Sequence, residues 1–249
     1  MRIVAVWSIK GGVGKTTTAT SLATLAARDG LRTLLWDLDP QGAASHLFRV
    51  APQRKQAPRD LVRRKVSLAD MARATDLFNL DLLPANLTYR ELEAELAARR
   101  QPRRRLKEKL DALRGIYELV LLDCAPSVTV VSEAVLTAAD VVLVPLAPSS
   151  LSLRTLEQMK EFRSEMDRKD APLVPFLTMA DLRRTVHREN AERLAGTGGF
   201  CATVIPMSSV VERAAEARTP LPLAAPRSPA GLAYEALWQE LKGRLGLPV

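Results

Sequence analysis

The chain has 249 residues, a mass of 27.3 kDa, 47% hydrophobic residues and a formal net charge of +8. That hydrophobic content excludes a disordered chain, and no apolar run approaches the roughly 20 residues that a membrane-spanning helix requires. The first residues form a strand-like run and not a signal peptide. We therefore expect a soluble, cytoplasmic protein with a single domain over residues 1–249.

The positive charge is concentrated in two segments. Residues 49–65 carry seven Lys or Arg against one acidic residue, and residues 99–114 carry eight against two. Each segment contributes +6, so the rest of the chain sums to −4. Such localised charge favours a polyanionic partner, with an ordinary solvated face as the alternative.

A glycine-rich turn joins the first two predicted elements. Residues 2–8 form an apolar, β-branched run typical of a strand, and residues 15–28 have the composition of a helix. The string KGGVGKTT, residues 10–17, lies across the junction. Such a turn directs several backbone N–H groups and a helix N-terminus at one small volume, which suits a polyphosphate.

Individual residues of this string fit a polyphosphate with Mg²⁺. Lys15 would supply a positive charge to the β- and γ-phosphates, and the Thr16 hydroxyl would bind Mg²⁺. The string departs from the ordinary P-loop because Ile9 stands where the first glycine is required. The predicted nucleotide-binding residues of the turn are Gly11, Gly12, Val13, Gly14, Lys15, Thr16 and Thr17.

A second lysine, Lys10, stands at the entrance of the turn. Lys15 would repel it unless the site holds more negative charge than one lysine neutralises. KGGVGKTT resembles the deviant Walker A motif of the ParA/MinD family of ATPases. The resemblance implies that Lys10 acts in trans, on phosphates bound by the partner of a nucleotide-sandwiched homodimer, and that hydrolysis requires dimerisation. A solvated surface lysine is the alternative.

The next predicted strand, residues 31–37, runs into the string DLDPQG. Asp37 and Asp39 lie at the carboxyl end of this strand, where ligand sites of open α/β sheets collect. The string also resembles the ParA family, which implies that Asp39 positions the attacking water, supports Mg²⁺ and belongs to a switch segment. A turn or cap aspartate is the alternative for Asp39, and Asp37 could be only a structural turn residue.

The middle of the chain is less regular. Residues 49–65 contain two prolines and predict a surface loop that enters a short helix. Residues 67–75 are expected to be helical, with Ser67 as the N-cap and Asp70 at N3. Residues 77–86 predict a strand that ends at a proline turn.

A basic helix is expected to begin near Pro102, a residue that suits the first helical turn. Leu106, Leu110 and Leu113 recur at helical spacing and predict a core-facing stripe. The basic residues of this helix would therefore point to solvent, as DNA-binding candidates or only as a solvated face. The two candidates are Arg103 and Arg104.

Residues 116–123 predict a buried strand that runs into the string DCAPS. Asp123 follows an apolar run in the Walker B manner, placed to hold Mg²⁺ directly or through bound water. The string resembles the switch II of the ParA family, with Ala125 in place of the first of two prolines. Asp123 is therefore a predicted catalytic and metal-binding residue, with a plain strand-end aspartate as the alternative.

Further strands are expected at residues 141–148 and 171–179, with a helix between them from about 150 to 168. Residues 201–206 predict a short strand, and Pro206 resembles the start of the family's adenine-binding loop. Arginines between and after these strands resemble the nonspecific DNA-binding residues of ParA proteins, although the loop beyond Pro206 departs from the family pattern. These candidates are Arg183, Arg184, Arg188, Arg213 and Arg218.

Two features bear on rival functions within the superfamily. Cys124 and Cys201 are the only cysteines, and we expect buried thiols and not a disulfide or an iron–sulfur site. The last predicted helix, residues 229–245, carries an apolar stripe that we expect to face the core. MinD-type relatives instead bind membranes through a C-terminal amphipathic tail.

The resemblance covers nearly the whole chain and implies the α/β fold of P-loop NTPases, a doubly wound, mostly parallel sheet of about seven or eight strands flanked by helices. It implies an ATP- and Mg²⁺-dependent ATPase that dimerises, binds double-stranded DNA nonspecifically on the nucleoid and is stimulated by a ParB-like partner. The cargo would be a chromosome, a plasmid or a protein assembly. A MinD-like membrane-cycling ATPase and an iron–sulfur reductase are the alternatives.

Overall fold

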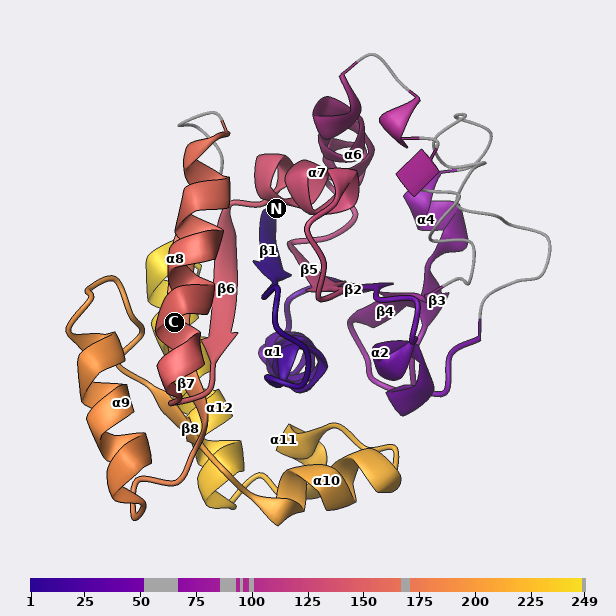
Figure 1. Cartoon of the computed structure of the whole chain (residues 1–249). Coiled ribbons are helices and arrows are strands. Elements are labelled where there is room, and N and C mark those ends of the chain that lie inside the picture. The colour runs from indigo at the N-terminus through magenta and orange to yellow at the C-terminus, as the bar shows by residue number, and fades with distance from the viewer. Residues whose placement is uncertain (52–66, 86–92, 95, 99–100, 167–170, 248–249) are drawn as a thin grey trace.

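The computed structural model describes residues 1–51, 67–85, 93–94, 96–98, 101–166 and 171–247. Within these residues, eight strands form one sheet in the order β3-β4-β2-β5-β1-β6-β7-β8 (Figure 1). Neighbouring strands run parallel except β3 and β4, which are antiparallel. The strands are β1 (Arg2–Val6), β2 (Thr33–Leu38), β3 (Arg73–Ala74), β4 (Leu80–Leu83), β5 (Leu119–Cys124), β6 (Val141–Leu146), β7 (Leu173–Ala180) and β8 (Val204–Pro206).

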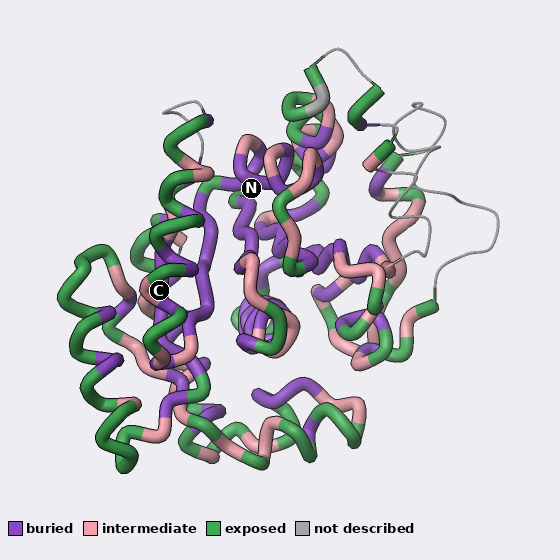
Figure 2. The backbone as a smooth tube through the Cα atoms, in the orientation of Figure 1, coloured by how far each residue is buried: buried purple, intermediate pink, exposed green. Residues whose placement is uncertain are grey.

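Helices cover both faces of the sheet, because its central strands are mostly apolar on both faces. Every residue of β2, β5 and β6 is buried, as expected for parallel strands between two helical layers (Figure 2). One apolar cluster joins the sheet to α6 (Pro102–Asp111), α7 (Val130–Ala138), α8 (Ser150–Ser164) and α9 (Thr185–Ala195). The other joins it to α1 (Lys15–Arg28), α2 (Ala43–Leu47), α10 (Ser209–Glu216), α11 (Leu221–Ala224) and α12 (Pro229–Leu245). The predicted fold class is confirmed.

The segment that follows residue 66 differs from the prediction. Ser67 caps a helix and forms a capping box with Asp70, as expected, but the helix α4 covers only Leu68–Met71. Ala72 is extended, and β3 then pairs with β4 in the antiparallel direction. The sheet pairing therefore ends the helix before residue 75. Residues 52–66, most of the first basic segment, lie outside the described residues.

The C-terminal helix α12 packs into the core, as predicted. Its apolar stripe is buried, namely Tyr234, Leu237, Trp238, Leu241 and Leu245. This stripe is therefore not available as a membrane-binding surface. In the part of the chain that the structure describes, no helix combines the length and the apolar character needed to cross a bilayer.

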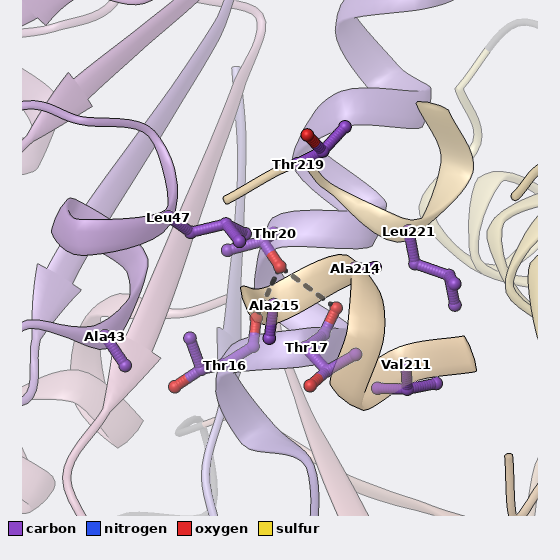
Figure 3. Close-up of a pocket in the computed structure, with 10 residues that line it drawn as sticks. All are labelled: Thr16, Thr17, Thr20, Ala43, Leu47, Val211, Ala214, Ala215, Thr219 and Leu221. Carbon is purple, nitrogen blue, oxygen red and sulfur yellow. Dashed lines mark hydrogen bonds between the residues drawn. The ribbon is translucent and has the colours of Figure 1, made fainter. Parts of the chain in front are cut away.

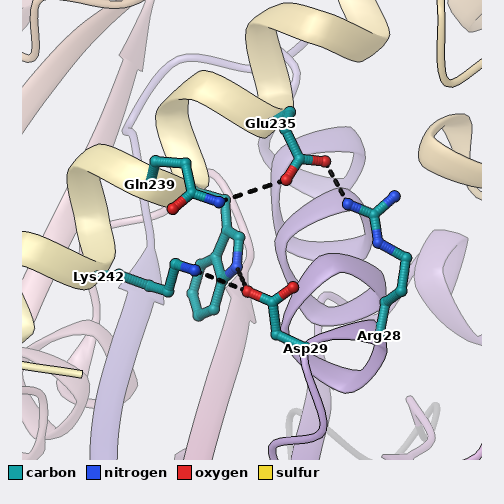
Figure 4. A network of polar contacts seen from close by, with 6 residues as sticks. Arg28, Asp29, Glu235, Gln239 and Lys242 are labelled. Carbon is teal, nitrogen blue, oxygen red and sulfur yellow. Dashed lines mark hydrogen bonds and ion pairs between the residues drawn. The ribbon is translucent and has the colours of Figure 1, made fainter. Parts of the chain in front are cut away.

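A polar network fastens α12 to the carboxyl end of α1 (Figure 4). The indole N–H of Trp238 and the ammonium of Lys242 both donate to Oδ2 of Asp29, each at 2.8 Å. Arg28 forms an ion pair with Glu235 beside them. Burial alone would raise the pKa of Asp29, but the hydrogen bonds from Lys242 and Trp238 outweigh it and hold this pKa below its ordinary value.

Candidate nucleotide site

The glycine-rich turn connects β1 to α1 at the carboxyl edge of the sheet. Gly12 and Gly14 have φ values of 69° and 84°, in the left-handed region that other residues rarely adopt. A Cβ on Gly12 would meet no atom within 4 Å, so this glycine is required by the backbone conformation and not by crowding. Gly14, with the same left-handed conformation, is the N-cap residue of α1.

The N-terminus of α1 has no side-chain cap and no acidic residue in its first turn. The first N–H groups of a helix have no partner within the helix, and they form the positive end of its dipole. An anion at this position can accept hydrogen bonds from these groups. The turn therefore offers the phosphate-binding geometry that the sequence predicts.

Lys15 is buried in the first turn of α1, with 7% of its surface exposed. Its ammonium donates to the carbonyl oxygen of Lys10 at 3.1 Å. Burial lowers the pKa of Lys15, and the negative charges of Asp123 and Asp39 oppose that effect. The side chain of Lys10 is only partly buried at the entrance of the turn.

Asp123 ends the apolar run of β5 in the middle of the sheet. Its neighbours in register are Val6 on β1 and Asp37 on β2, so parallel pairing brings two carboxylates to the edge beside the turn. Asp123 is fully buried, and neither of its carboxylate oxygens has a hydrogen-bond partner among the described residues. Burial raises its pKa well above the ordinary value, and the charge of Asp37 adds to this, while the nearby Thr16 hydroxyl, which does not meet the geometry of a hydrogen bond to this carboxylate, and the charge of Lys15 oppose it.

This arrangement fits a divalent cation shared with phosphate. An unpaired buried carboxylate costs several kcal/mol, and a cation at its oxygens would remove that cost. Among the described residues, no group of three or more His, Cys, Asp or Glu side chains could hold a metal by itself. Mg²⁺ commonly uses one or two carboxylates and completes its coordination with phosphate and water oxygens. Thr16, Asp123 and Asp39 therefore fit Mg²⁺ only together with a bound triphosphate.

Asp37 and Asp39, two residues apart, have different surroundings. Asp37 is buried and accepts hydrogen bonds from the backbone and hydroxyl of Ser45, at 2.8 and 2.7 Å. Burial raises the pKa of Asp37, opposed by these bonds. Asp39 is partly exposed, and its Oδ1 accepts from the backbone N–H of Gln41 at 3.0 Å.

A cavity of about 440 Å³ opens beside the turn, within the usual size range of small-molecule pockets. Pro206, the predicted start of an adenine-binding loop, lines it together with Gly12, Gly14 and Thr17 of the turn. Sequence reasoning missed Thr178 and Met179 on β7, which line the other side. Their position at the carboxyl end of a parallel strand is the signal that could have identified them. The remaining lining residues are Ile205, Met207, Ser208, Ser209, Val211, Glu212 and Tyr234.

A smaller cavity of about 170 Å³ lies between α1, α2 and α10 (Figure 3). Thr16, Thr17 and Thr20 form its α1 side, where the Thr20 hydroxyl donates to the carbonyl of Thr16 at 2.8 Å. The side chain of Leu47 on α2 and that of Val211 on α10 contribute apolar walls. Two contacts bridge the same helices: Arg218 hydrogen-bonds the ring of His46, and Arg49 donates to the carbonyl of Ala217 at 3.3 Å.

The predicted DNA-binding arginines do not form one group. Those on α6 lie far from α9 and α10, which occupy the opposite end of the molecule (Figure 1). Several already have partners: Arg103 pairs with Glu133 at 2.9 Å and Arg183 with Asp181 at 2.9 Å. Arg213 donates to the hydroxyl of Ser209 at 3.3 Å. The other candidates are Arg218, which contacts His46, and Arg104, Arg184 and Arg188, which are exposed.

The two cysteines are buried, as expected. Neither forms a disulfide, and they lie on opposite faces of the sheet, in different apolar clusters. Burial raises the pKa of Cys124 well above its ordinary value and raises that of Cys201 to about 12. Both thiols therefore remain protonated and behave as small apolar side chains.

The sequence of this chain is similar to those of known proteins. A family model described as an AAA domain matches residues 1–173. The chromosome partitioning protein ParA of Caulobacter vibrioides is 36% identical over 199 residues, which cover 77% of this chain and 74% of that protein. The sporulation initiation inhibitor protein Soj of Bacillus subtilis is 32% identical over 247 residues, covering 96% and 98%.

A solved structure shows the same fold with ligands bound. It is the cobyrinic acid a,c-diamide synthase from Mycobacterium smegmatis with bound ADP and magnesium. This structure has a TM-score of 0.83 and 29% sequence identity, and the match covers 99% of this chain and 96% of that one.

Proposed function

The chain belongs to the ParA/Soj family of partition ATPases, and on that premise we propose that it hydrolyses ATP with Mg²⁺ in order to switch its binding to DNA. The observation that carries this proposal is the pair formed by an uncapped helix N-terminus and a buried carboxylate that has no hydrogen-bond partner among the described residues. Lys15 lies at the helix N-terminus, and Asp123 is the buried carboxylate. Both features cost free energy unless a phosphate and a cation occupy the site.

We assign the phosphate groups to the turn and the base to the larger cavity. The backbone of residues 11–14, with Lys15, Thr16 and Thr17, would hold the phosphates, and Pro206 would face the adenine. Thr16 and Asp123, with Asp39 in support, would hold Mg²⁺. When bound there, Mg²⁺ neutralises charge that develops on the phosphate oxygens. The ADP and magnesium in the related M. smegmatis structure support this assignment.

Hydrolysis would then depend on two side chains with different tasks. Lys15 stabilises negative charge on the transferred phosphoryl group, an electrostatic contribution that is large in a site that excludes water. Asp39 is partly exposed at the edge of the site and can accept a hydrogen bond from the attacking water. The described residues place no arginine side chain among those that line the phosphate turn. We therefore expect slow turnover that a ParB-like partner accelerates.

A second copy of this chain is the partner that the phosphate edge fits. Exposed apolar side chains follow the carboxyl ends of four of the five strands from β5 to β8 in the sheet order: Val128 after β5, Leu151 after β6, Met179 and Leu182 at β7, and Met207 after β8. All of them lie on the edge that carries Lys10. Contiguous exposed apolar groups mark interaction surfaces. Two protomers that meet there would bring each Lys10 to the other protomer's triphosphate.

DNA binding is assigned to the arginines near α9 and α10. Arg184 and Arg188 are exposed, and Arg213 and Arg218 lie on the α10 side. Lysine and arginine contacts to phosphates give binding without sequence preference that weakens steeply with salt. A dimer doubles the number of such contacts, so ATP-dependent dimerisation would switch DNA affinity. Release of DNA on hydrolysis would drive segregation of DNA, or positioning of a cargo, over the nucleoid.

The direct test is DNA binding measured by fluorescence anisotropy with ATP, with ADP and without nucleotide, across a salt series. We expect tight binding only with ATP, and a steep loss of affinity with increasing salt. Equal affinity in all three conditions would overturn the proposed switch. Binding to liposomes with ATP, in place of binding to DNA, would support the membrane-cycling alternative.

A further inference from the structure

Asp37 differs from Asp123 although the two residues are neighbours in register on adjacent strands. Asp123 has no hydrogen-bond partner among the described residues, whereas Asp37 accepts three hydrogen bonds. Its Oδ2 accepts from both groups of Ser45, and its Oδ1 accepts from the backbone N–H of Asp39 at 3.3 Å. The protein therefore already occupies the oxygens of Asp37, and it leaves those of Asp123 for another ligand.

Ser45 takes part in most of these contacts. It is buried in α2, and its hydroxyl donates to Asp37 at 2.7 Å while it accepts from the backbone N–H of Ala85 at 2.8 Å. Ala85 follows β4, the neighbour of β2 in the sheet. One hydroxyl in the middle of α2 thus joins this helix to the carboxyl ends of two strands. Hydrogen bonds to a carboxylate are about twice as strong as those between neutral groups.

The segment held by these contacts contains Asp39. The segment runs from Asp39 to Ser45. Asp37 accepts a hydrogen bond from the backbone N–H of Asp39 at one end and from that of Ser45 at the other. Between them the chain makes a tight turn, in which Gly42 N–H donates to the carbonyl of Asp39 at 2.9 Å. Gln41 N–H orients the Asp39 carboxylate from within the same turn. The direction of that carboxylate therefore depends on both ends of the turn.

We propose that Ser45 is a positioning residue for Asp39, and that Asp37 serves as its anchor and not as a metal ligand. The inference rests on the proposed function, because it assigns a task within the same ATPase site. Without the Ser45 hydroxyl, Asp37 keeps only backbone donors, and the N–H of Ala85 loses its acceptor. The turn at residues 39–42 then samples other positions, and Asp39 spends less time aligned with the water.

The test compares Ser45→Ala with Ser45→Thr, which keeps the hydroxyl, and with Ser21→Ala as a matched control. Ser21 is also a buried serine, but its hydroxyl has no hydrogen-bond partner among the described residues. Three measurements apply: ATP affinity, single-turnover hydrolysis at saturating ATP and Mg²⁺, and amide hydrogen exchange of residues 38–47 without nucleotide.

For Ser45→Ala we expect a roughly tenfold lower hydrolysis rate, within the range that misplacement of a reacting group by about 1 Å can cost. ATP affinity should stay within about twofold, because Ser45 does not line either cavity beside the turn. Exchange over residues 38–47 should become severalfold faster. Ser45→Thr should recover most of the rate, and Ser21→Ala should match the wild type in all three measurements.

A double-mutant cycle keeps the inference falsifiable if one variant is poorly stable. Asp37→Asn and Ser45→Ala should each slow hydrolysis, and Ser45→Ala should slow Asp37→Asn by less than it slows the wild type, because the two changes share the Ser45–Asp37 contact and only the Ala85 contact is lost in addition. A hydrolysis rate in Ser45→Ala equal to that of Ser21→Ala would overturn the inference and leave the proposed function intact. A much higher Mg²⁺ concentration needed for hydrolysis by Asp37→Asn, but not by Ser45→Ala, would make Asp37 a ligand and also overturn it. Absence of ATP turnover in the wild type would overturn the proposed function, and this inference with it.

Discussion

The two ends of α1 bury charge in opposite ways. At the carboxyl end, the ammonium of Lys242 lies 2.8 Å from the carboxylate of Asp29, and Trp238 donates to the same oxygen (Figure 4). At the N-terminal end, Lys15 has only a carbonyl oxygen as its acceptor, and nearby Asp123 has no partner among the described residues. Paired buried charge holds the fold together, whereas unpaired buried charge marks the place for a ligand.

The largest effect is expected on ATP turnover, at the N-terminal end of α1. Lys15→Ala should lower ATP turnover by at least about a hundredfold, the scale of loss when a transition-state donor is removed from an enclosed site. Stability should not fall, since the variant removes a buried charge whose ammonium contacts no carboxylate in the part of the chain that the structure describes. Single-turnover hydrolysis and urea unfolding of the same preparation measure the two quantities. A variant that unfolds easily would show that Lys15 is structural.

At the carboxyl end of α1, we expect a substitution to lower stability and to leave ATP turnover unchanged. Lys242→Met should lower the free energy of unfolding by about 2 kcal/mol, because Asp29 loses a charged hydrogen bond in a partly buried position. ATP turnover per folded molecule should remain unchanged. Urea unfolding measures the loss, with Lys107→Met as the control, since Lys107 lies exposed on α6. Equal stability of the two variants would remove the contrast between the ends of α1.

A smaller effect is expected in the pH dependence of stability, because the paired end of α1 contains the titratable group Asp29. The pKa of Asp29 is lower in the folded state than its ordinary value of 3.8, so its contribution to stability is present above that value. It is lost as the pH falls through the folded pKa. Asp29→Asn should therefore show a flatter decrease in stability than the wild type as the pH falls from about 5 to below 3.8, because the loss begins near the ordinary pKa and continues below it. Parallel decreases in the two proteins would contradict the pairing of Asp29 with Lys242.

Local patterns predicted the N-terminal end of α1 better than its carboxyl end. The strand-turn-helix pattern identified the phosphate turn, and the predicted helices at residues 15–28 and 229–245 match α1 and α12. These features depend on glycine conformation, on helix caps and on apolar periodicity, which neighbouring residues determine.

The polar contacts could not be predicted in the same way. Lys242 reads as an exposed basic residue near a helix end, because its partner Asp29 is 213 positions away in the sequence. The contacts of Ser45 could not be predicted either, because they depend on the sheet order, which places β4 beside β2. The shortened helix at Leu68–Met71 has the same cause, since pairing of β3 with β4 overrides local helix propensity.

Asp123→Asn tests the central claim most directly, because it changes the one carboxylate that the fold buries without a partner among the described residues. The measurement is thermal unfolding of wild type and variant, with and without ATP and Mg²⁺. We predict that the variant without ligand is at least as stable as the wild type, and that it loses most of the stabilisation conferred by Mg²⁺ with ATP. A variant that is less stable without ligand, yet stabilised by Mg²⁺ and ATP as strongly as the wild type, would contradict the account.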